Sequence, residues 1–475
     1  QALKPHNPSS RSLARCSHDE MALLRILGFS CGSGRCCCTI VVLQALIAVV
    51  LLAPSVLTAS AHEESGLMNA LMKVKKSSSY LRGLGFKKPP DTRPHSCRRN
   101  WRNADFGPNS SVSIIIPYLH ESWEHFSKTM KAILHFTPDN LIKEFLFISD
   151  GNEPSFTYEA QLTAMSPKVR VIINEQRLGL IKAKMKAVSM ATADVLVFLE
   201  AHTIVNRDWL EPLLLRVKES PHALVQPTLD IIPQENFDQY YRGAHGHWRF
   251  EWNMNLIFTS PPDGGEFDDE SDKPMPSPAT SGGIFAIRRD WWNRLGFYDP
   301  EMREWGGDHV EATMKVWRCG GHIDVHPCSR VGHLFRDPEH RPYNVDVPTV
   351  VHNYARLASV WWDDYLPKFQ QLKPETKHMQ LGDVSPQKRL REELGCKDMG
   401  WYLRYVDPEM EWEASHICIP GGAKEYGGCE RAAVHGRSCI DRSMPAEEYQ
   451  SRRAEIREYW STQAVDVNDF EGHEL

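Results

Sequence analysis

Short apolar runs alternate with stretches of helical periodicity between residues 111 and 217. Four of the runs have the length of buried strands: 112–116, 145–148, 169–173 and 195–199. Two intervening stretches place apolar residues at helical spacing: Phe126, Met130, Ile133 and Leu134, then Leu180, Ala183, Ala187 and Met190. A further helix is predicted over 208–217, with Asp208 as its capping residue. Alternating strands and helices predict an α/β fold around a mostly parallel, buried sheet.

Two of the predicted strands end in side chains suited to binding, Asp150-Gly151 after the second and Glu200-Ala201-His202 after the fourth. Ligands gather at the carboxyl ends of strands in parallel sheets. Residues two apart in an extended segment point the same way, so Glu200 and His202 can reach one ion. A carboxylate and an imidazole suit Mn²⁺, and a diphosphate can complete its shell. In isolation, such a pair is more often a solvated Glu and a hydrogen-bonded His, and Asp-Gly is commonly a turn.

The N-terminal part of the chain is interpreted as targeting sequence. Residues 40–53 are apolar except for Gln44. Residues 39–59 are expected to form a signal anchor that spans the membrane, with residues 1–38 in the cytosol. The alternative is a cleaved signal peptide with Ala59-Ser60-Ala61 as its processing site. Residues 60–96 contain Ser and Lys runs and are expected to form an extended stem. Both interpretations place the rest of the chain in the lumen or outside the cell.

Composition narrows the functional classes. The 475-residue chain is 41% hydrophobic and 24% charged, which is ordinary for a globular protein. Its net charge of −6 argues against a general grip on nucleic acid. Seven cysteines follow the apolar segment, and in an oxidising compartment they are expected to form disulfides. None of them has a Cys-x-x-Cys spacing, so a zinc site is not expected.

Eight separate stretches, in one order along the chain, carry a family resemblance. They are DTRPHSC (91–97), HESW (120–123), RLGLIKAK (177–184), FLEAHT (198–203), FEWNMNL (250–256), SPATSGGIFAI (277–287), WGGDHVEATMKVWRCGG (305–321) and CSRVGHLFR (328–336). Together they resemble the polypeptide N-acetylgalactosaminyltransferases, which are type II Golgi membrane enzymes of the GT-A fold. The resemblance covers roughly residues 91–415. It implies a GT-A catalytic domain over residues 97–415, with a Rossmann-like nucleotide-binding half and a mixed central sheet.

The resemblance also implies roles for particular residues. A Mn²⁺ site would be made of three side chains: Glu200, His202 and His333. Five residues would bind the donor: Asp150, Arg177, Ala201, Gly282 and Gly283. Asp150 would accept hydrogen bonds from the uracil, and the two glycines would let the backbone approach the sugar. Five more would surround the transfer step: Trp305, Asp308, Glu311, Arg336 and Tyr343. Of these, Trp305 would lie against the leaving diphosphate and Arg336 would neutralise its charge.

The activity implied by the resemblance is transfer of GalNAc from UDP-GalNAc to Ser/Thr hydroxyls of polypeptides, which initiates mucin-type O-glycosylation in the Golgi. The family retains the anomeric configuration. No residue of the family pattern is an obvious covalent nucleophile, so we expect same-face attack, with the departing phosphate oxygen taking the acceptor proton; hydrogen bonding from Asp308 is an alternative form of assistance. Two other functions stay open: a GT-A transferase for another UDP-sugar, and a weakly active or noncatalytic relative.

The chain departs from the family pattern around this site. Glu200 stands where Asp is usual, and its extra methylene moves the carboxylate by about one bond length. Pro117 and Leu119 occupy positions that resemble uridine contacts, where Thr and His are usual. Ser281 replaces a usual Ala, and Asp308 a usual Glu. These changes are compatible with a shifted donor preference or a weak enzyme.

The resemblance does not extend to the C-terminal part. Family members commonly continue into a β-trefoil lectin module, but residues 416–475 carry no repeated Gln-x-Trp pattern. We expect an irregular tail there, with a helix over 446–459, and no lectin. The resemblance also pairs Cys97 with Cys328 and Cys319 with Cys396.

Overall fold

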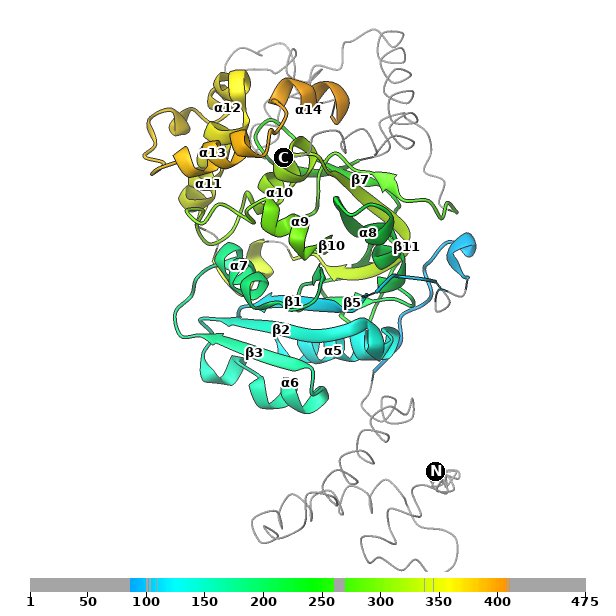
Figure 1. Ribbon diagram of the computed structural model, residues 1–475. Coiled ribbons are helices and arrows are strands. Elements are labelled where there is room, and N and C mark those ends of the chain that lie inside the picture. Colours follow the sequence, from blue (N-terminus) through cyan, green and yellow to red (C-terminus); the bar gives the residue numbers. More distant parts are fainter. Residues whose placement is uncertain are drawn as a thin grey trace, which may run out of the picture. The chain divides into compact units, whose positions relative to one another are not determined.

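The computed structural model describes residues 86–99, 101, 104–108, 110–259, 270–336, 338–344, 346–407 and 410 (Figure 1). The expected cytosolic segment, the signal anchor, most of the stem and the C-terminal tail lie outside these residues. Within them, no helix is long and apolar enough to cross a membrane.

A mixed sheet forms the centre of the fold. Its strands are β1 (Val112–Tyr118), β2 (Ile142–Asp150), β3 (Val169–Asn174), β4 (Val195–Phe198), β5 (Thr203–Val205), β6 (Ala223–Ile232), β9 (Met275–Pro276), β10 (Phe285–Arg288) and β11 (His322–Leu334). The order is β3-β2-β1-β4-β10-β6-β11-β5, and β9 pairs with β11. Strands β3, β2, β1 and β4 are parallel, whereas β10 is antiparallel to both of its neighbours. The four strands predicted from the apolar runs are confirmed, and so is the mixed sheet.

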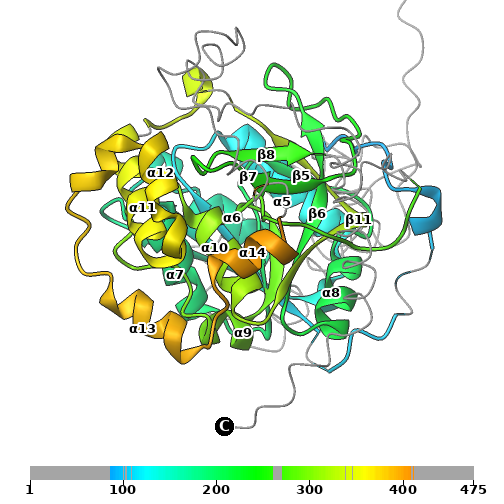
Figure 2. The ribbon, with the colours of Figure 1, turned by 90° about the horizontal axis from the view of Figure 1, so that it is seen from above.

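Helices cover both faces of this sheet (Figures 1 and 2). They are α5 (Trp123–Phe136), α6 (Glu159–Met165), α7 (Leu180–Met190), α8 (Leu210–Glu219), α9 (Arg289–Arg294), α10 (Asp308–Arg318), α11 (Val347–Trp361), α12 (Leu366–Leu372), α13 (Ser385–Glu393) and α14 (Met399–Tyr405). A hairpin of β7 (His247–Phe250) and β8 (Leu256–Thr259) forms a second, small sheet.

Alternation along the strands divides the interior into two cores. Ile115 of β1 packs into the core that includes α7, α9, α10 and α11, whereas Ile114 and Ile116 pack into the core under α5, α6 and α8. Successive strand residues point to opposite faces, so a strand buried on both sides reads as a continuous apolar run. This explains why the predicted strands showed no polar alternation.

The predicted cap of α8 is wrong. The helix begins at Leu210 after Trp209, and no side chain caps it. Asp208 instead has a positive φ of 49° and accepts a hydrogen bond from Arg93 at 2.6 Å. The Asp208 carboxylate therefore binds Arg93, which is distant in sequence, and does not cap the helix.

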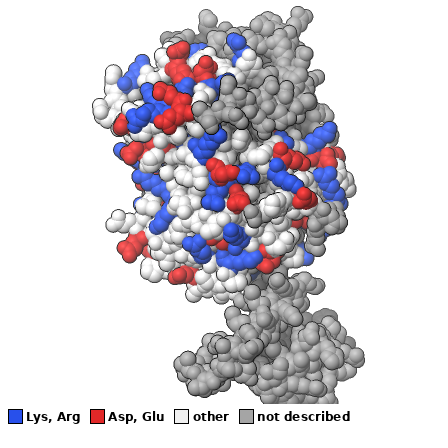
Figure 3. Space-filling view, viewed as in Figure 1, with Lys and Arg blue, Asp and Glu red and all other residues white. Residues whose placement is uncertain are grey.

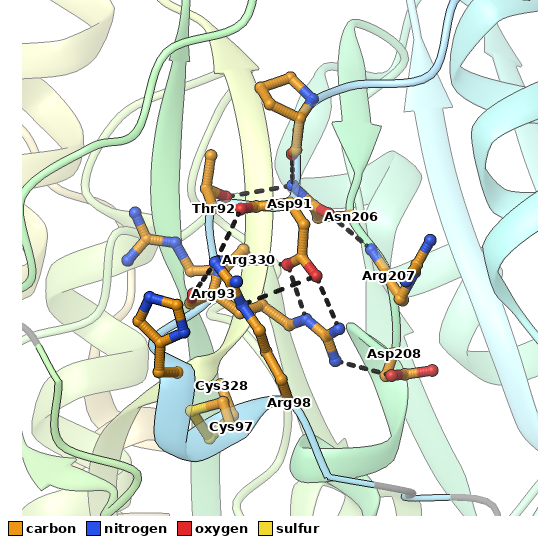
Figure 4. A network of polar contacts seen from close by, with 12 residues as sticks. Asp91, Thr92, Arg93, Cys97, Arg98, Asn206, Arg207, Asp208, Cys328 and Arg330 are labelled. Atoms are coloured by element: carbon orange, nitrogen blue, oxygen red, sulfur yellow. Dashed lines mark hydrogen bonds and ion pairs between the residues drawn. A yellow bond between two sulfur atoms is a disulfide. The ribbon is translucent and has the colours of Figure 1, made fainter.

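The part of the expected stem around Asp91, Thr92 and Arg93 is not free of the domain, because its side chains join a polar network with Asn206, Asp208 and Arg330 (Figure 4). Thr92 and Arg93 are buried. Asn206 donates to the Pro90 carbonyl at 2.8 Å and to the Thr92 hydroxyl at 3.1 Å. The packed domain thus begins before the boundary at 97 that was predicted from the sequence.

Both disulfides implied by the resemblance are present, Cys97–Cys328 and Cys319–Cys396. The first fastens the 86–99 segment to β11, on the strand that carries His333. Peptide mapping under nonreducing conditions should recover both pairs. Recovery of Cys97 as a free thiol would contradict the first.

Candidate metal and nucleotide site

Glu200, His202 and His333 converge at one edge of the central sheet. Glu200 and His202 lie in the short turn between β4 and β5, and His333 on β11 pairs with Thr203 of β5. Glu200 Oε2 lies 2.9 Å from His202 Nε2 and 2.7 Å from His333 Nε2. One ligand atom from each residue lies within 4.8 Å of the others. The structure therefore brings together all three expected metal ligands, although His333 is distant in sequence.

Hydrogen bonds from three elements hold the turn in place. The buried Thr129 hydroxyl of α5 donates to the Ala201 carbonyl at 2.9 Å and accepts from the Thr203 N–H at 3.2 Å. The Thr203 hydroxyl donates to the Glu200 carbonyl at 2.9 Å. On the other side, the Leu334 N–H donates to the His202 carbonyl at 3.3 Å. A strand end that is fixed in this way presents its side chains in a defined direction.

Without an ion, Glu200 and His202 stabilise each other's charged forms, so a cation would have to displace a proton from His202. Burial by itself would raise the pKa of Glu200, but His333 and His202 hold it well below its usual value. Burial by itself would lower the pKa of His202, but the carboxylates of Glu121 and Glu200 raise it to about 9. One carboxylate oxygen and two imidazole nitrogens form a donor set that fits Mn²⁺ and other divalent ions.

The glycine pair explains how the longer carboxylate fits. A Cβ on Gly283 would lie 2.2 Å from Glu200 Oε1, so any larger residue there would force the carboxylate to shift. Gly282 has a positive φ of 83°, and a Cβ on it would lie 2.6 Å from His309 Cβ. Besides the expected access for a donor sugar, Gly283 thus makes space for Glu200 itself.

A cavity of about 110 Å³ is lined by two of the three side chains, Glu200 and His202. Its wall includes most of the residues assigned to donor binding and transfer: Asp150, Arg177, Ala201, Gly283, Trp305, Arg336 and Tyr343. Pro117 and Leu119, the two departures at expected uridine contacts, also line it. The wall therefore joins residues from β1, β2, α7, the Glu200 turn and the segment after β11.

Asp150 is already hydrogen-bonded within the protein. Its carboxylate accepts from the Asn174 amide at 2.9 Å, the Leu178 N–H at 2.9 Å and the Gly179 N–H at 2.8 Å. These bonds hold the loop before α7, which carries Arg177, against the cavity. Arg177 in turn pairs with Glu304 at 3.2 Å, beside Trp305. Asp150 thus positions the loop that forms this part of the cavity wall. Its expected contact with the uracil would use the remaining lone pairs of the same carboxylate.

Asp308 and Glu311 do not line the cavity. Asp308 is buried and pairs with Lys184 at 2.8 Å. Burial by itself would raise the pKa of Asp308, but Lys184 and His309 hold this pKa well below its usual value. Both Glu311 oxygens accept the Asp299 N–H at 2.9 Å, and Glu311 also pairs with Lys315 at 2.9 Å. Direct catalytic roles for these two carboxylates do not agree with their positions.

Lys184 and Glu121 line the cavity and were not singled out from the sequence. Lys184 donates to Asp308 and, at 2.9 Å, to the Gly282 carbonyl, so it places a cation in the wall. Glu121 contacts His202 and Arg336. Both residues lie in stretches that carry the family resemblance, Lys184 in RLGLIKAK and Glu121 in HESW. Their position in these stretches does not reveal which side chains they contact in the fold.

The segment after β11 closes one side of the cavity. Arg336 donates to Glu121 Oε1 at 2.6 Å, and Arg341 lies 5.7 Å from the centre of the Trp305 ring. Burial, and then the charge of Glu200, raises the pKa of Tyr343. Three expected residues of the transfer step, Trp305, Arg336 and Tyr343, are therefore neighbours of the cavity.

Comparisons with known proteins agree with this arrangement. A model of glycosyl transferase family 2 matches residues 113–296, and a model described as the N-terminal domain of galactosyltransferase matches residues 267–340. The fold is similar to that in a crystal structure of GalNAc-T7 with UDP, GalNAc and Mn²⁺, with a TM-score of 0.59 and 29% sequence identity. The matched region covers 64% of this chain and 58% of the GalNAc-T7 chain. The expected GT-A fold is thereby confirmed.

The sequence relatives share one family name. Inactive polypeptide N-acetylgalactosaminyltransferase-like protein 5 of Macaca fascicularis is 35% identical, over 74% of this chain and 79% of its own length. Polypeptide N-acetylgalactosaminyltransferase 16 of Homo sapiens is 34% identical, over 71% of this chain and 60% of its own length. Polypeptide N-acetylgalactosaminyltransferase 5 of Caenorhabditis elegans is 32% identical, and this chain spans 56% of its length. The chain belongs to the polypeptide N-acetylgalactosaminyltransferase family.

Proposed function

We propose that the chain transfers GalNAc from UDP-GalNAc to Ser/Thr hydroxyls of polypeptides, with Mn²⁺ and with retention of configuration. The observation that carries this proposal is the convergence of Glu200, His202 and His333 beside a cavity that Arg336 and Lys184 line with positive charge. The GalNAc-T7 structure, with UDP, GalNAc and Mn²⁺, supports the choice of ligands.

In this proposal Glu200, His202 and His333 hold the ion. Mn²⁺, when bound, would stabilise negative charge on the leaving diphosphate. Arg336 would contact the same diphosphate from the segment after β11, and Trp305 would lie against it. Lys184, through Gly282 and Asp308, would fix the backbone next to the sugar.

The cavity wall supports same-face attack rather than a covalent intermediate. It contains three carboxylates, Glu121, Asp150 and Glu200. Each is hydrogen-bonded to other groups in the described part of the chain. A retaining enzyme with a covalent intermediate directs a carboxylate oxygen at the sugar carbon, whereas these carboxylates are directed at His202, a backbone N–H and His333. We therefore assign acceptance of the acceptor proton to the departing phosphate oxygen.

Specific observations favour a second candidate, a relative that binds nucleotide without transfer. The macaque relative is named inactive. In this chain Asp308 is held by Lys184, outside the cavity wall, and Glu200 occupies the space beside Gly283. A transferase for another UDP-sugar is the third candidate, because Pro117 and Leu119 line the cavity and Ser281 departs from the usual Ala.

A donor-hydrolysis assay with several UDP-sugars separates these candidates. It is run with Mn²⁺ and with a chelator, both with and without a Ser/Thr peptide. Mn²⁺-dependent turnover of UDP-GalNAc and transfer to the peptide are expected. Turnover of a different UDP-sugar would favour the third candidate, and binding of UDP without turnover would favour the second.

We place this activity in the Golgi lumen, on a chain anchored through residues 39–59. Two disulfides support an oxidising compartment. Basic and acidic side chains are interspersed on the face drawn in Figure 3, which gives no broad basic surface there for nucleic acid. Localisation of a tagged chain by microscopy, with protease protection of its C-terminal tag, tests the placement.

A further inference from the structure

Glu121 is a buried carboxylate that touches both the proposed metal centre and Arg336. It follows β1 and precedes α5, and its side chain is 4% exposed. Glu121 Oε2 lies 2.8 Å from His202 Nδ1, and Glu121 Oε1 accepts from Arg336 Nη2 at 2.6 Å. Oε1 also lies 3.2 Å from His125 Nδ1. One carboxylate thus joins groups from the Glu200 turn, from α5 and from the segment after β11.

The contact with His202 decides which ring nitrogen can bind an ion. Nδ1 faces a carboxylate that accepts hydrogen bonds, so the proton belongs on Nδ1. Nε2 faces Glu200 Oε2 at 2.9 Å, so an ion held between these two atoms would displace the Nε2 proton and receive the Nε2 lone pair, while Nδ1 keeps its proton. Partners of this kind orient metal-ligating histidines and raise their basicity.

The contact with Arg336 decides where a flexible cation rests. Arg336 is 12% exposed at its side chain and lines the cavity. A guanidinium on a long side chain loses rotamer freedom when it is held, so an anchored Arg336 needs less ordering when a diphosphate binds. The second carboxylate oxygen of Glu121 supplies that anchor.

We propose that Glu121 is a positioning residue that couples the ion-binding His202 to the diphosphate-binding Arg336. The inference rests on the proposed function and deepens it. Its chemical content is that one carboxylate sets both the tautomer of a metal ligand and the resting position of the cation that meets the leaving group.

The test measures two affinities in the purified 475-residue chain. The first is the dissociation constant for Mn²⁺ without nucleotide, from the electron paramagnetic resonance of free Mn²⁺. The second is the dissociation constant for UDP at saturating Mn²⁺, from calorimetry. The variants are Glu121→Gln, Arg336→Ala and the double variant. Glu124→Gln is the matched control, because Glu124 lies three residues away with a 68% exposed side chain and pairs only with Lys128 among the ion pairs of the described residues.

Glu121→Gln should weaken Mn²⁺ binding by about 10- to 100-fold, as loss of such a partner typically does. A glutamine has one oxygen and one NH₂ group, so either His202 or Arg336 would face a donor. Arg336→Ala should not weaken Mn²⁺ binding. Both single variants should weaken UDP binding, and the double variant should bind UDP no more weakly than Arg336→Ala. The control should match the wild type in both affinities.

Two results would overturn the inference alone: wild-type Mn²⁺ affinity in a folded Glu121→Gln, or additive effects of the two changes on UDP binding. A wild-type chain that binds no Mn²⁺ would instead overturn the metal centre, and the inference with it. If Glu121→Gln fails to fold, Glu121→Asp decides, because it keeps the charge but is too short to reach both partners. Unchanged affinities in that variant would also overturn the inference.

Discussion

Replacing Glu200 with glutamine is expected to lower Mn²⁺-dependent turnover of UDP-GalNAc by about 100-fold or more. Glutamine keeps the shape and hydrogen bonding of the side chain but removes the charge that both histidines face at 2.9 and 2.7 Å. Stabilisation of a leaving diphosphate by an ion is worth several kcal/mol, and an ion needs this carboxylate. Turnover and Mn²⁺ affinity, measured together, check the expectation.

Glu200→Asp is the informative partner of this change. It restores the family's usual residue, and we expect it to retain or raise turnover. Equal turnover in the wild type and both variants would mean that Glu200 does not bind the ion. Gly283→Ala adds a structural control: its Cβ would meet Glu200 Oε1 at 2.2 Å. Gly283→Ala should weaken Mn²⁺ binding when residue 200 is Glu. The same change should weaken Mn²⁺ binding less in the Glu200→Asp variant, because the aspartate side chain is one methylene shorter.

Asp230→Asn is expected to lower the free energy of unfolding by about 3–5 kcal/mol, the usual cost of leaving one member of a buried ion pair alone. Asp230 and Arg330 are both fully buried, and Arg330 Nε donates to Asp230 Oδ1 at 3.0 Å. Asp230 also accepts from the Thr92 hydroxyl at 2.5 Å and the Gly243 N–H at 2.9 Å. The change removes the only negative charge that the described residues pair with Arg330.

Denaturant unfolding of the purified chain measures this loss. Asp238→Asn is the control, because Asp238 is 50% exposed and pairs with Lys128 at the surface. It should change the free energy of unfolding by less than about 1 kcal/mol. A similar small loss for Asp230→Asn would show that the buried network does not hold the 86–99 segment and β11 together.

The amino-acid sequence alone was enough to predict the local elements and the strand ends at which the candidate site lies. Four apolar runs became strands β1 to β4, because strands buried on both faces read as continuous apolar runs. It also placed Glu200 and His202 at a strand end, since a parallel sheet collects such ends along one edge. His333 and both disulfide pairings came from the resemblance to a known family, which carries long-range information that periodicity lacks.

The packing of distant segments determines which polar side chains face the cavity and which are held elsewhere. Asp308 and Glu311 matched a family motif, yet Lys184 and the Asp299 N–H hold them outside its wall. Glu121 reaches the site because β1 ends beside the Glu200 turn and beside Arg336, which lies 215 residues away in sequence. A carboxylate binds whichever donor the fold brings within about 3 Å, and that choice depends on chain segments far apart in sequence.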